Sequence, residues 1–202
     1  MYVPPHFAET DIPALHAAMR AVRLPVLVGH GLDGLIASHV PMLLDAAAGE
    51  FGTLIGHVAK ANPHARATGP GLAIFQGPEA YITPSWYATK RETEKVVPTW
   101  NYVAVHASGP VEWFSEPARL LDVVTRLTER FEDERREPWA VTDAPADFVA
   151  GMLKGIAGFA LTITKLEGKV KMSQNRPQAD RAGVADGLRA DGRDDVAALI
   201  PR

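Results

Sequence analysis

The residues best suited to chemistry lie in the segment Gly56-His57-Val58-Ala59-Lys60-Ala61-Asn62-Pro63-His64, which follows a predicted strand. This segment provides an imidazole, a primary amine and an amide within six positions, and a proline then ends the run. A phosphate group is bound by such a set of one cation, a few neutral donors and exposed backbone amides. It is not a Walker loop, because the glycines and the Gly-Lys-Ser/Thr ending are missing. The alternative is a solvated loop with a basic tip, which composition alone favours.

A second group of residues stands where a long predicted strand begins. Thr99, Trp100 and Asn101 precede a run rich in valine and tyrosine. A strand built only for packing favours apolar residues on its inward face and ordinary polar residues outside. A hydroxyl, an aromatic ring and an amide at the mouth of the strand could instead stack on a flat polar ring and hydrogen-bond to it.

A third group lies at the end of a later strand, just before a predicted helix. It combines three cations with three amide or hydroxyl groups: Lys169, Lys171, Ser173, Gln174, Asn175 and Arg176. A polar strand end with a helix cap explains it equally well. Together with Lys60, however, this group would give two sources of positive charge for one anionic ligand.

Ser38 and His39 interrupt an apolar strand, where a hydroxyl and an imidazole need partners if they are buried. A lone histidine in such a place is more often a satisfied core residue than a ligand. His39 and His57 could face one cavity from neighbouring strands. No carboxylate accompanies them at ligand spacing, so a metal site has only weak support and we predict none.

Bond-breaking chemistry has little support in the sequence. There is no Gly-x-Ser-x-Gly elbow, and the acidic residues fall largely in turns and on helix faces. The chain has no cysteine, which excludes disulfides, zinc–thiolate sites, iron–sulfur clusters and thiol catalysis. We therefore predict no catalytic residue, and a binding function is favoured over an enzymatic one.

Length and composition are those of one globular domain: 202 residues, of which 47% are hydrophobic and 22% charged. A formal net charge of -3 argues against a broad basic surface for nucleic acid, although a local patch or a dimer presenting two patches stays open. The N-terminus does not resemble a signal peptide, and no apolar run approaches the roughly 20 residues of a membrane helix. We expect a cytoplasmic protein.

The order of the predicted elements indicates an α+β fold with an antiparallel barrel. Short strands with turn signals are expected at residues 24–28, 35–44, 51–58, 71–76 and 80–83, followed by long strands at 99–113 and 159–172. Residues 84–95 are expected to form a polar loop. Helices are expected after the cap at Thr10 or Asp11 and at 117–131, 145–156 and 177–188. The apolar face of the helix at 117–131 should consist of Leu120, Leu121, Val124, Leu127 and Phe131.

Over roughly residues 1–188 the sequence resembles the PaiB-type family, the FMN-binding negative transcriptional regulators. The resemblance rests on long blocks: Met1-Tyr2-Val3-Pro4, Ala37-Ser38-His39-Val40-Pro41, the run from Gly52 to Pro63, the run from Phe75 to Tyr87, the run from Val96 to Tyr102, Glu167-Gly168-Lys169 and the run from Lys171 to Pro177.

The resemblance implies a split β-barrel, mostly antiparallel and Greek-key-like with flanking helices, related to pyridoxamine-phosphate oxidases. It also implies a homodimer with FMN at the interface. Lys60 and Asn62 would contact the phosphate, and Ser38, His39, Thr53, His57 and Val58 would lie near the phosphate or the ring. Thr99, Trp100 and Asn101 would lie near the isoalloxazine ring, and Gln174 and Arg176 could reach the site from the partner chain.

One FMN-binding split-barrel domain is therefore expected at 1–188, with helical additions at 117–156 and 177–188 and a flexible tail at 189–202. The implied function is repression of transcription, yet no helix-turn-helix is visible, and the arginines from 119 to 136 alternate with acidic residues as on a solvated face. Promoter DNA is thus only a weakly supported partner. The alternatives are an FMN-dependent oxidoreductase on the same scaffold and a haem binder that uses His39 or His57 as the axial ligand.

Overall fold

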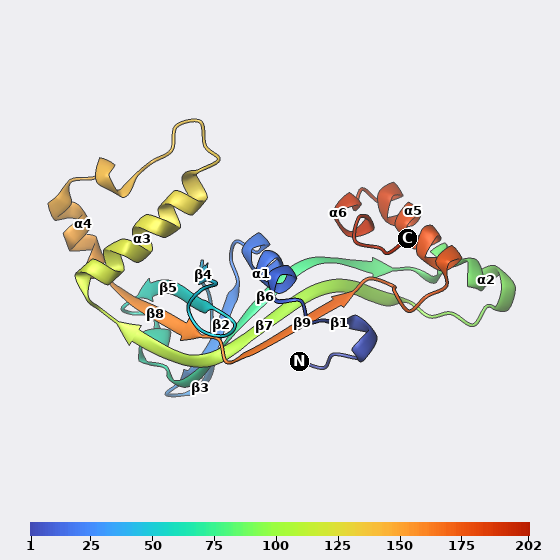
Figure 1. Ribbon diagram of the computed structural model, residues 1–202, viewed down its shortest axis with the longest axis horizontal. Helices are drawn as coiled ribbons and strands as arrows, with labels where there is room; N and C mark the ends of the chain where they lie inside the picture. The colour runs from blue at the N-terminus through green and yellow to red at the C-terminus, as the bar shows by residue number, and fades with distance from the viewer. The chain divides into compact units, whose positions relative to one another are not determined.

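The computed structural model describes residues 1–202, and the chain divides into two compact units. The central unit comprises Met19–Phe75 and His106–Leu166; the terminal unit comprises Met1–Ala18, Gln76–Val105 and Glu167–Arg202. The strands β6 (Thr68–Ile82) and β7 (Thr99–Phe114), which are labelled in Figure 1, each supply residues to both units.

The central unit is built on an antiparallel sheet. Besides its parts of β6 and β7 it contains β2 (Val26–Gly31), β3 (Gly34–His39), β4 (Leu43–Asp45), β5 (Thr53–Ala59) and β8 (Ile156–Thr162). The strand order is β3-β2-β6-β7-β8-β5-β4. Register places Leu27 opposite Ser38 and Leu54 opposite Leu161, so alternating apolar residues reach the core.

Helices cover part of this sheet. They are η2 (Pro63–Arg66), α3 (Pro117–Glu132), η4 (Val141–Asp143) and α4 (Ala146–Leu153). Pro117 begins α3, where a missing backbone N–H costs nothing. Leu120, Val123 and Leu127 are buried against Phe114. Leu121 was expected on this face but is 41% exposed, because it is turned about 100° away from Leu120 around the helix.

Glycines permit close approach inside the central unit. On β8, a Cβ at Gly158 would come within 2.3 Å of the ring of Phe114, its partner on β7. The ring can therefore lie flat against the strand only because position 158 carries no side chain.

The terminal unit begins with η1 (Pro5–Phe7), β1 (Ala8–Glu9) and α1 (Ile12–Ala21), the last of which runs on into the central unit. Asp11 caps α1, since its Oδ2 accepts from the N–H of Ala14 at 2.9 Å. β9 (Lys165–Lys171) pairs with β1 and β7. The remaining elements are η3 (Pro84–Trp86), α2 (Ala88–Thr93), α5 (Gln178–Ala190) and α6 (Asp194–Ala197).

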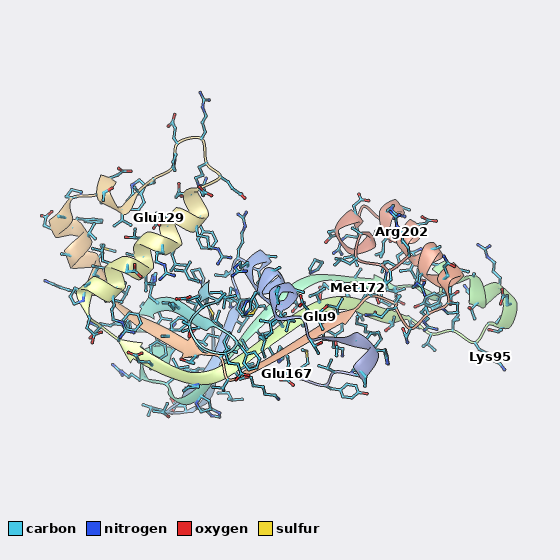
Figure 2. The ribbon with its side chains drawn as sticks, in the orientation of Figure 1. Glu9, Lys95, Glu129, Glu167, Met172 and Arg202 are labelled. Atoms are coloured by element: carbon cyan, nitrogen blue, oxygen red, sulfur yellow. The ribbon has the colours of Figure 1, made fainter.

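The last residues of the chain are packed, whereas the sequence led us to expect a loose tail from residue 189. α5 continues to Ala190 and α6 follows. Val196, Ala197 and Ile200 are buried in a cluster with Met172, whose side chain is labelled in Figure 2. Apolar residues spaced within an Asp-rich segment can bury one face of a short helix only if a neighbouring helix covers them.

Several predicted elements differ in detail from those observed. Residues 35–44 form two strands, because Pro41 has no N–H with which to continue a ladder. Residues 159–172 form parts of β8 and β9, separated where the N–H of Thr164 bonds to the carbonyl of Ser108. The two short strands predicted between 71 and 83 are one strand, β6, and the expected loop at 84–95 contains η3 and α2.

The predicted α+β class with an antiparallel sheet and flanking helices is confirmed. No helix has the combination of length and apolar character needed to cross a bilayer.

Candidate functional site

A polar cluster in the central unit joins β3 to η2. Asn62 is the N-cap of η2, and its Oδ1 accepts from the N–H of His64 at 2.9 Å. This bond turns the amide so that Nδ2 donates to Ser38 Oγ at 3.1 Å. Ser38 Oγ in turn lies 2.8 Å from Nδ1 of His64. Two of the predicted residues, Ser38 and Asn62, therefore meet, together with a histidine that was not predicted as a site residue.

Lys60 lies two residues before this cluster, just after β5 ends at Ala59. Its backbone N–H donates to Gly155 at 2.9 Å, which fixes the main chain. Its side chain is exposed and forms neither an ion pair nor a side-chain hydrogen bond. An unpaired ammonium carried two residues before a preset amide and hydroxyl suits an anion such as a phosphate.

The other predicted residues of the central unit have different surroundings. His39 is exposed at the end of β3, and Val58 is buried on β5. The hydroxyl of Thr53 is used inside the protein, because it donates to the carbonyl of Ala48 at 2.8 Å. His57 is half-buried on β5, its Nδ1 has no partner, and burial lowers the pKa of its imidazole. Neutral imidazole is thus the favoured form of His57.

In the terminal unit, Trp100 is the most available of the predicted residues. It is 52% exposed, and its ring lies 5.9 Å from that of Tyr81 in an edge-on arrangement. Two exposed aromatic rings side by side give a surface on which a planar ligand can lie. Thr99 is half-buried next to it on β7.

Asn101 was expected near the ring and Gln174 was a candidate for reaching the site from the partner chain; within this chain both form internal contacts. Asn101 is fully buried, and its amide both donates to Ser173 Oγ at 2.9 Å and accepts from it at 3.3 Å. Gln174 accepts from the N–H of Met172 at 2.6 Å and donates to the carbonyl of Val170. These bonds hold a turn in which Ser173 has a φ of 62°, so both amides serve to shape the chain.

Arg176 places its guanidinium 4.6 Å from the centre of the Tyr87 ring. Tyr87 is 1% exposed, and burial raises the pKa of its phenol, an effect that Arg176 opposes. The cation–π contact anchors Arg176 beside the core of the terminal unit.

Two lysines of the third predicted group, Lys169 and Lys171, lie on one face of β9. Lys169 is only 7% exposed; its Nζ donates to the carbonyl of Tyr2 at 3.1 Å and lies 5.1 Å from the ring centre of Tyr102. Lys171 is hydrogen-bonded to Thr99 Oγ1. Their two-residue spacing on a strand places both side chains on the same face.

No carboxylate forms an ion pair with either lysine. Burial lowers the pKa of Lys171; the nearby Tyr102 raises it, and Lys169 and Arg176 lower it further. Cations gathered without a counter-charge are costly unless a ligand supplies the negative charge. This lysine pair is therefore a second candidate contact for an anionic ligand.

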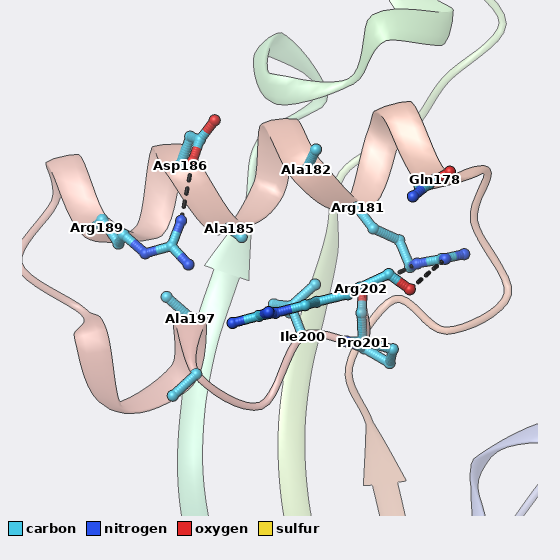
Figure 3. Close-up of a pocket in the computed structure, with 11 residues that line it drawn as sticks. Gln178, Arg181, Ala182, Ala185, Asp186, Arg189, Ala197, Ile200, Pro201 and Arg202 are labelled. Carbon is cyan, nitrogen blue, oxygen red and sulfur yellow. Dashed lines mark hydrogen bonds and ion pairs between the residues drawn. The ribbon is translucent and has the colours of Figure 1, made fainter.

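A groove of about 510 Å³ in the terminal unit lies apart from these residues, between α5 and the segment from α6 to the C-terminus (Figure 3). Arg181, which lines it, donates to the carbonyls of Arg176, Pro201 and Arg202 at 2.7–3.1 Å. Its guanidinium therefore pins the chain end and is not available to a ligand.

Each unit, taken by itself, offers groups that suit one part of FMN. In the central unit Lys60 with Ser38 and Asn62 can receive a phosphate, and in the terminal unit the exposed Trp100 with Thr99 can receive a flat ring. No group of three or more His, Cys, Asp or Glu side chains stands ready to hold a metal ion.

Comparison with known proteins agrees with this chemistry. A family model described as "Putative FMN-binding domain" matches residues 1–165. The chain is 34% identical to "Uncharacterized protein AN0679" of Emericella nidulans over 96% of this chain and 92% of that protein. It is 31% identical to "Protease synthase and sporulation protein PAI 2" of Bacillus subtilis over 93% of this chain and 89% of that protein.

The fold recurs in the flavocytochrome Anf3 from Azotobacter vinelandii, with a TM-score of 0.62 and 14% sequence identity, covering 90% of this chain and 78% of that one. This likeness confirms the predicted split-barrel fold of the pyridoxamine-phosphate oxidase kind. The chain thus belongs to the family of FMN-binding domains that includes the PaiB-like proteins, and FMN is the cofactor of that family.

Proposed function

We propose that the protein is a homodimeric FMN-binding regulator in which Lys60, Asn62 and Ser38 hold the phosphate and Thr99 and Trp100 contact the ring. The observation that carries the proposal is the set of preset hydrogen-bonding groups of Ser38 and Asn62, with the unpaired Lys60 two residues before Asn62, in a chain of the FMN-binding family. When bound, FMN supplies electron-transfer chemistry that amino-acid side chains lack.

A second copy of the chain would complete the site in this proposal. Trp100 and Tyr81 are each about half exposed, and Val97 on the approach to the same strand is 66% exposed. A planar cofactor is retained well only when both faces are covered. We infer that two copies enclose the flavin, and that Lys169 and Lys171 add positive charge toward it.

Regulation would follow from the dependence of the dimer on the flavin. If FMN binds the dimer better than the single chain, then FMN occupancy shifts the population of dimers and so the contact with a partner. α3 is a poor DNA-reading surface, because three nearby arginines are paired with acids: Arg119 with Glu112, Arg126 with Asp122 and Arg135 with Glu132. Promoter DNA, if contacted directly, would be met by another surface.

The test begins with the visible spectrum and the molar mass of the purified protein, with and without added FMN. The proposal is supported by a flavin spectrum together with a fraction of dimer that increases when FMN is added. A colourless single chain that ignores FMN refutes it. A Soret band would indicate the haem alternative.

The contribution of Lys60 is measured with Lys60→Gln, with Lys165→Gln as the control because Lys165 is an exposed lysine of the same unit at the start of β9. Loss of one charge-assisted contact of about 1.5–3 kcal/mol should weaken FMN binding roughly 10- to 100-fold. The control should bind like wild type. Equal affinities for both variants would remove Lys60 from the site.

Two further measurements separate a regulator from an enzyme. Salt-sensitive binding to a promoter fragment, changed by FMN, supports the regulator. Sustained NAD(P)H oxidation with an added acceptor, without any DNA binding, would support the FMN-dependent oxidoreductase instead.

A further inference from the structure

His64 is the most deeply buried polar group near the proposed phosphate site. It is 1% exposed, although it belongs to the short helix η2 at the surface end of β5. Its Nδ1 faces Ser38 Oγ at 2.8 Å, whereas its Nε2 has no partner. A buried imidazole with one satisfied and one unsatisfied nitrogen calls for an explanation.

The surroundings of Nε2 exclude a ligand at that atom. The cavity beside it is about 10 Å³, which is the room of roughly one water molecule. Its lining is mainly apolar or backbone, including Gly29, Ala67, Val111 and Trp113. A Cβ at Gly29 would lie 3.0 Å from Nε2, so the ring has little space to move. His64 can therefore act on a ligand only through Ser38.

The proton on the imidazole is located by the same contacts. Burial lowers the pKa of His64, so the ring is neutral and carries one proton. A proton on Nε2 would have no acceptor in the protein, and the one-water cavity beside it has a mainly apolar lining that holds a water poorly, so this N–H is disfavoured. A proton on Nδ1 has an acceptor in Ser38 Oγ at 2.8 Å. The favoured tautomer therefore donates from Nδ1 to Ser38.

Ser38 then receives two hydrogen bonds, from His64 Nδ1 and from Asn62 Nδ2 at 3.1 Å. Its own proton must point elsewhere. Asn62 Oδ1 lies 3.5 Å away, which is too long for a good O–H···O bond, and that oxygen already accepts from the N–H of His64. The hydroxyl proton of Ser38 is thus aimed out of the cluster.

We propose that His64 is a positioning residue that fixes Ser38 as a hydrogen-bond donor to a phosphate oxygen of FMN. The proposal rests on the phosphate site proposed above and adds a residue and a direction to it. A hydroxyl that is already oriented loses less freedom on binding than a free rotor does.

The first test reads the tautomer of His64 by ¹⁵N NMR of the side-chain imidazole in the full-length protein, with FMN as the titrant. The proton should be on Nδ1, and the FMN-bound protein should show that form alone. An imidazole protonated on Nε2 in the FMN complex would overturn the proposal. If flavin fluorescence shows that FMN does not bind at all, the proposed function falls together with this inference, so the two failures are distinguishable.

The second test is a double-mutant cycle on FMN affinity. His64→Phe should weaken FMN binding about five-fold, the equivalent of one neutral hydrogen bond. His64→Asn, whose amide nitrogen can replace Nδ1, should keep most of the affinity. In a Ser38→Ala background His64→Phe should have no further effect, because the two residues act together.

A merely structural role for His64 predicts a different pattern. His64→Phe would then cost the same affinity with or without Ser38, and that additivity refutes the proposal. If His64→Phe fails to fold, the tautomer of the wild-type protein still decides the question.

Discussion

Asp180 provides the sharpest test of how the terminal unit is held together. It is the one buried carboxylate, 1% exposed on α5, and it binds both polar groups of Thr89 on α2. Its Oδ1 accepts from the Thr89 N–H at 2.8 Å, and its Oδ2 accepts from the Thr89 hydroxyl at 2.9 Å. The carboxylate therefore joins two helices that are about 90 residues apart in sequence.

Asp180→Asn replaces one acceptor oxygen by an NH₂ group and removes the charge. Both charge-assisted bonds of about 1.5–3 kcal/mol then become neutral bonds of about 0.5–1.5 kcal/mol, because the new amide nitrogen can donate to the Thr89 hydroxyl oxygen. We expect the free energy of unfolding to fall by roughly 2–3 kcal/mol, measured by urea unfolding at pH 7.

Hydrogen exchange followed by mass spectrometry shows where the loss occurs. Exchange should rise in α2 and α5 and stay unchanged in α3, which belongs to the other unit. Asp186→Asn is the matched control, because Asp186 is on the same helix but its side chain is 79% exposed, paired with Arg189. It should cost at most about 0.5 kcal/mol.

Thr89→Val removes only the hydroxyl, so it should cost less than Asp180→Asn, and the two changes together should be less than additive. If Asp180→Asn costs no more than Asp186→Asn, the buried bonds to Thr89 contribute nothing net and the reasoning fails.

Three further outcomes are expected. Gly158→Ala should destabilise the protein by about 1–3 kcal/mol, because the new Cβ meets the Phe114 ring. Gly151→Ala in α4 should stabilise it by about 0.5–1 kcal/mol, because the space around Gly151 is open. Equal midpoints of the two variants in thermal unfolding would contradict this. Burial lowers the pKa of His57 below its ordinary value of 6.5, so the unfolded chain binds more protons than the folded one. The free energy of unfolding should therefore be highest above about pH 6.5 and fall as the pH drops below that value. His57→Gln should reduce this dependence on pH in urea titrations. Trp100→Ala should reduce the quenching of flavin fluorescence on binding; identical quenching places the indole away from the ring.

The closeness of two of the predicted phosphate-binding residues follows from the sequence alone. Lys60 and Asn62 are separated by two positions in one turn, so their proximity is a local property that the chain alone dictates. Asn62 followed by Pro63 also indicates a capped helical turn, and η2 forms there. The roles of the predicted site residues toward FMN stay predictions.

The internal use of Asn101 and Gln174 could not be predicted, because an amide in a strand or a turn looks the same whether it faces a ligand or the chain. Only the register of distant segments sets Asn101 against Ser173, 72 residues later. The same is true of Lys171 and Thr99.

The sequence by itself determined the α+β class, the antiparallel strands, the amphipathic α3 and the absence of thiol chemistry, since each depends on local periodicity or on residue type. The tertiary structure decided which polar groups meet. Ser38 and His64 lie 26 residues apart and come to 2.8 Å only because β3 and η2 pack together. The packing of the last helix against α5 was decided in the same way, because burial of a short apolar face depends on a neighbour that local sequence does not specify.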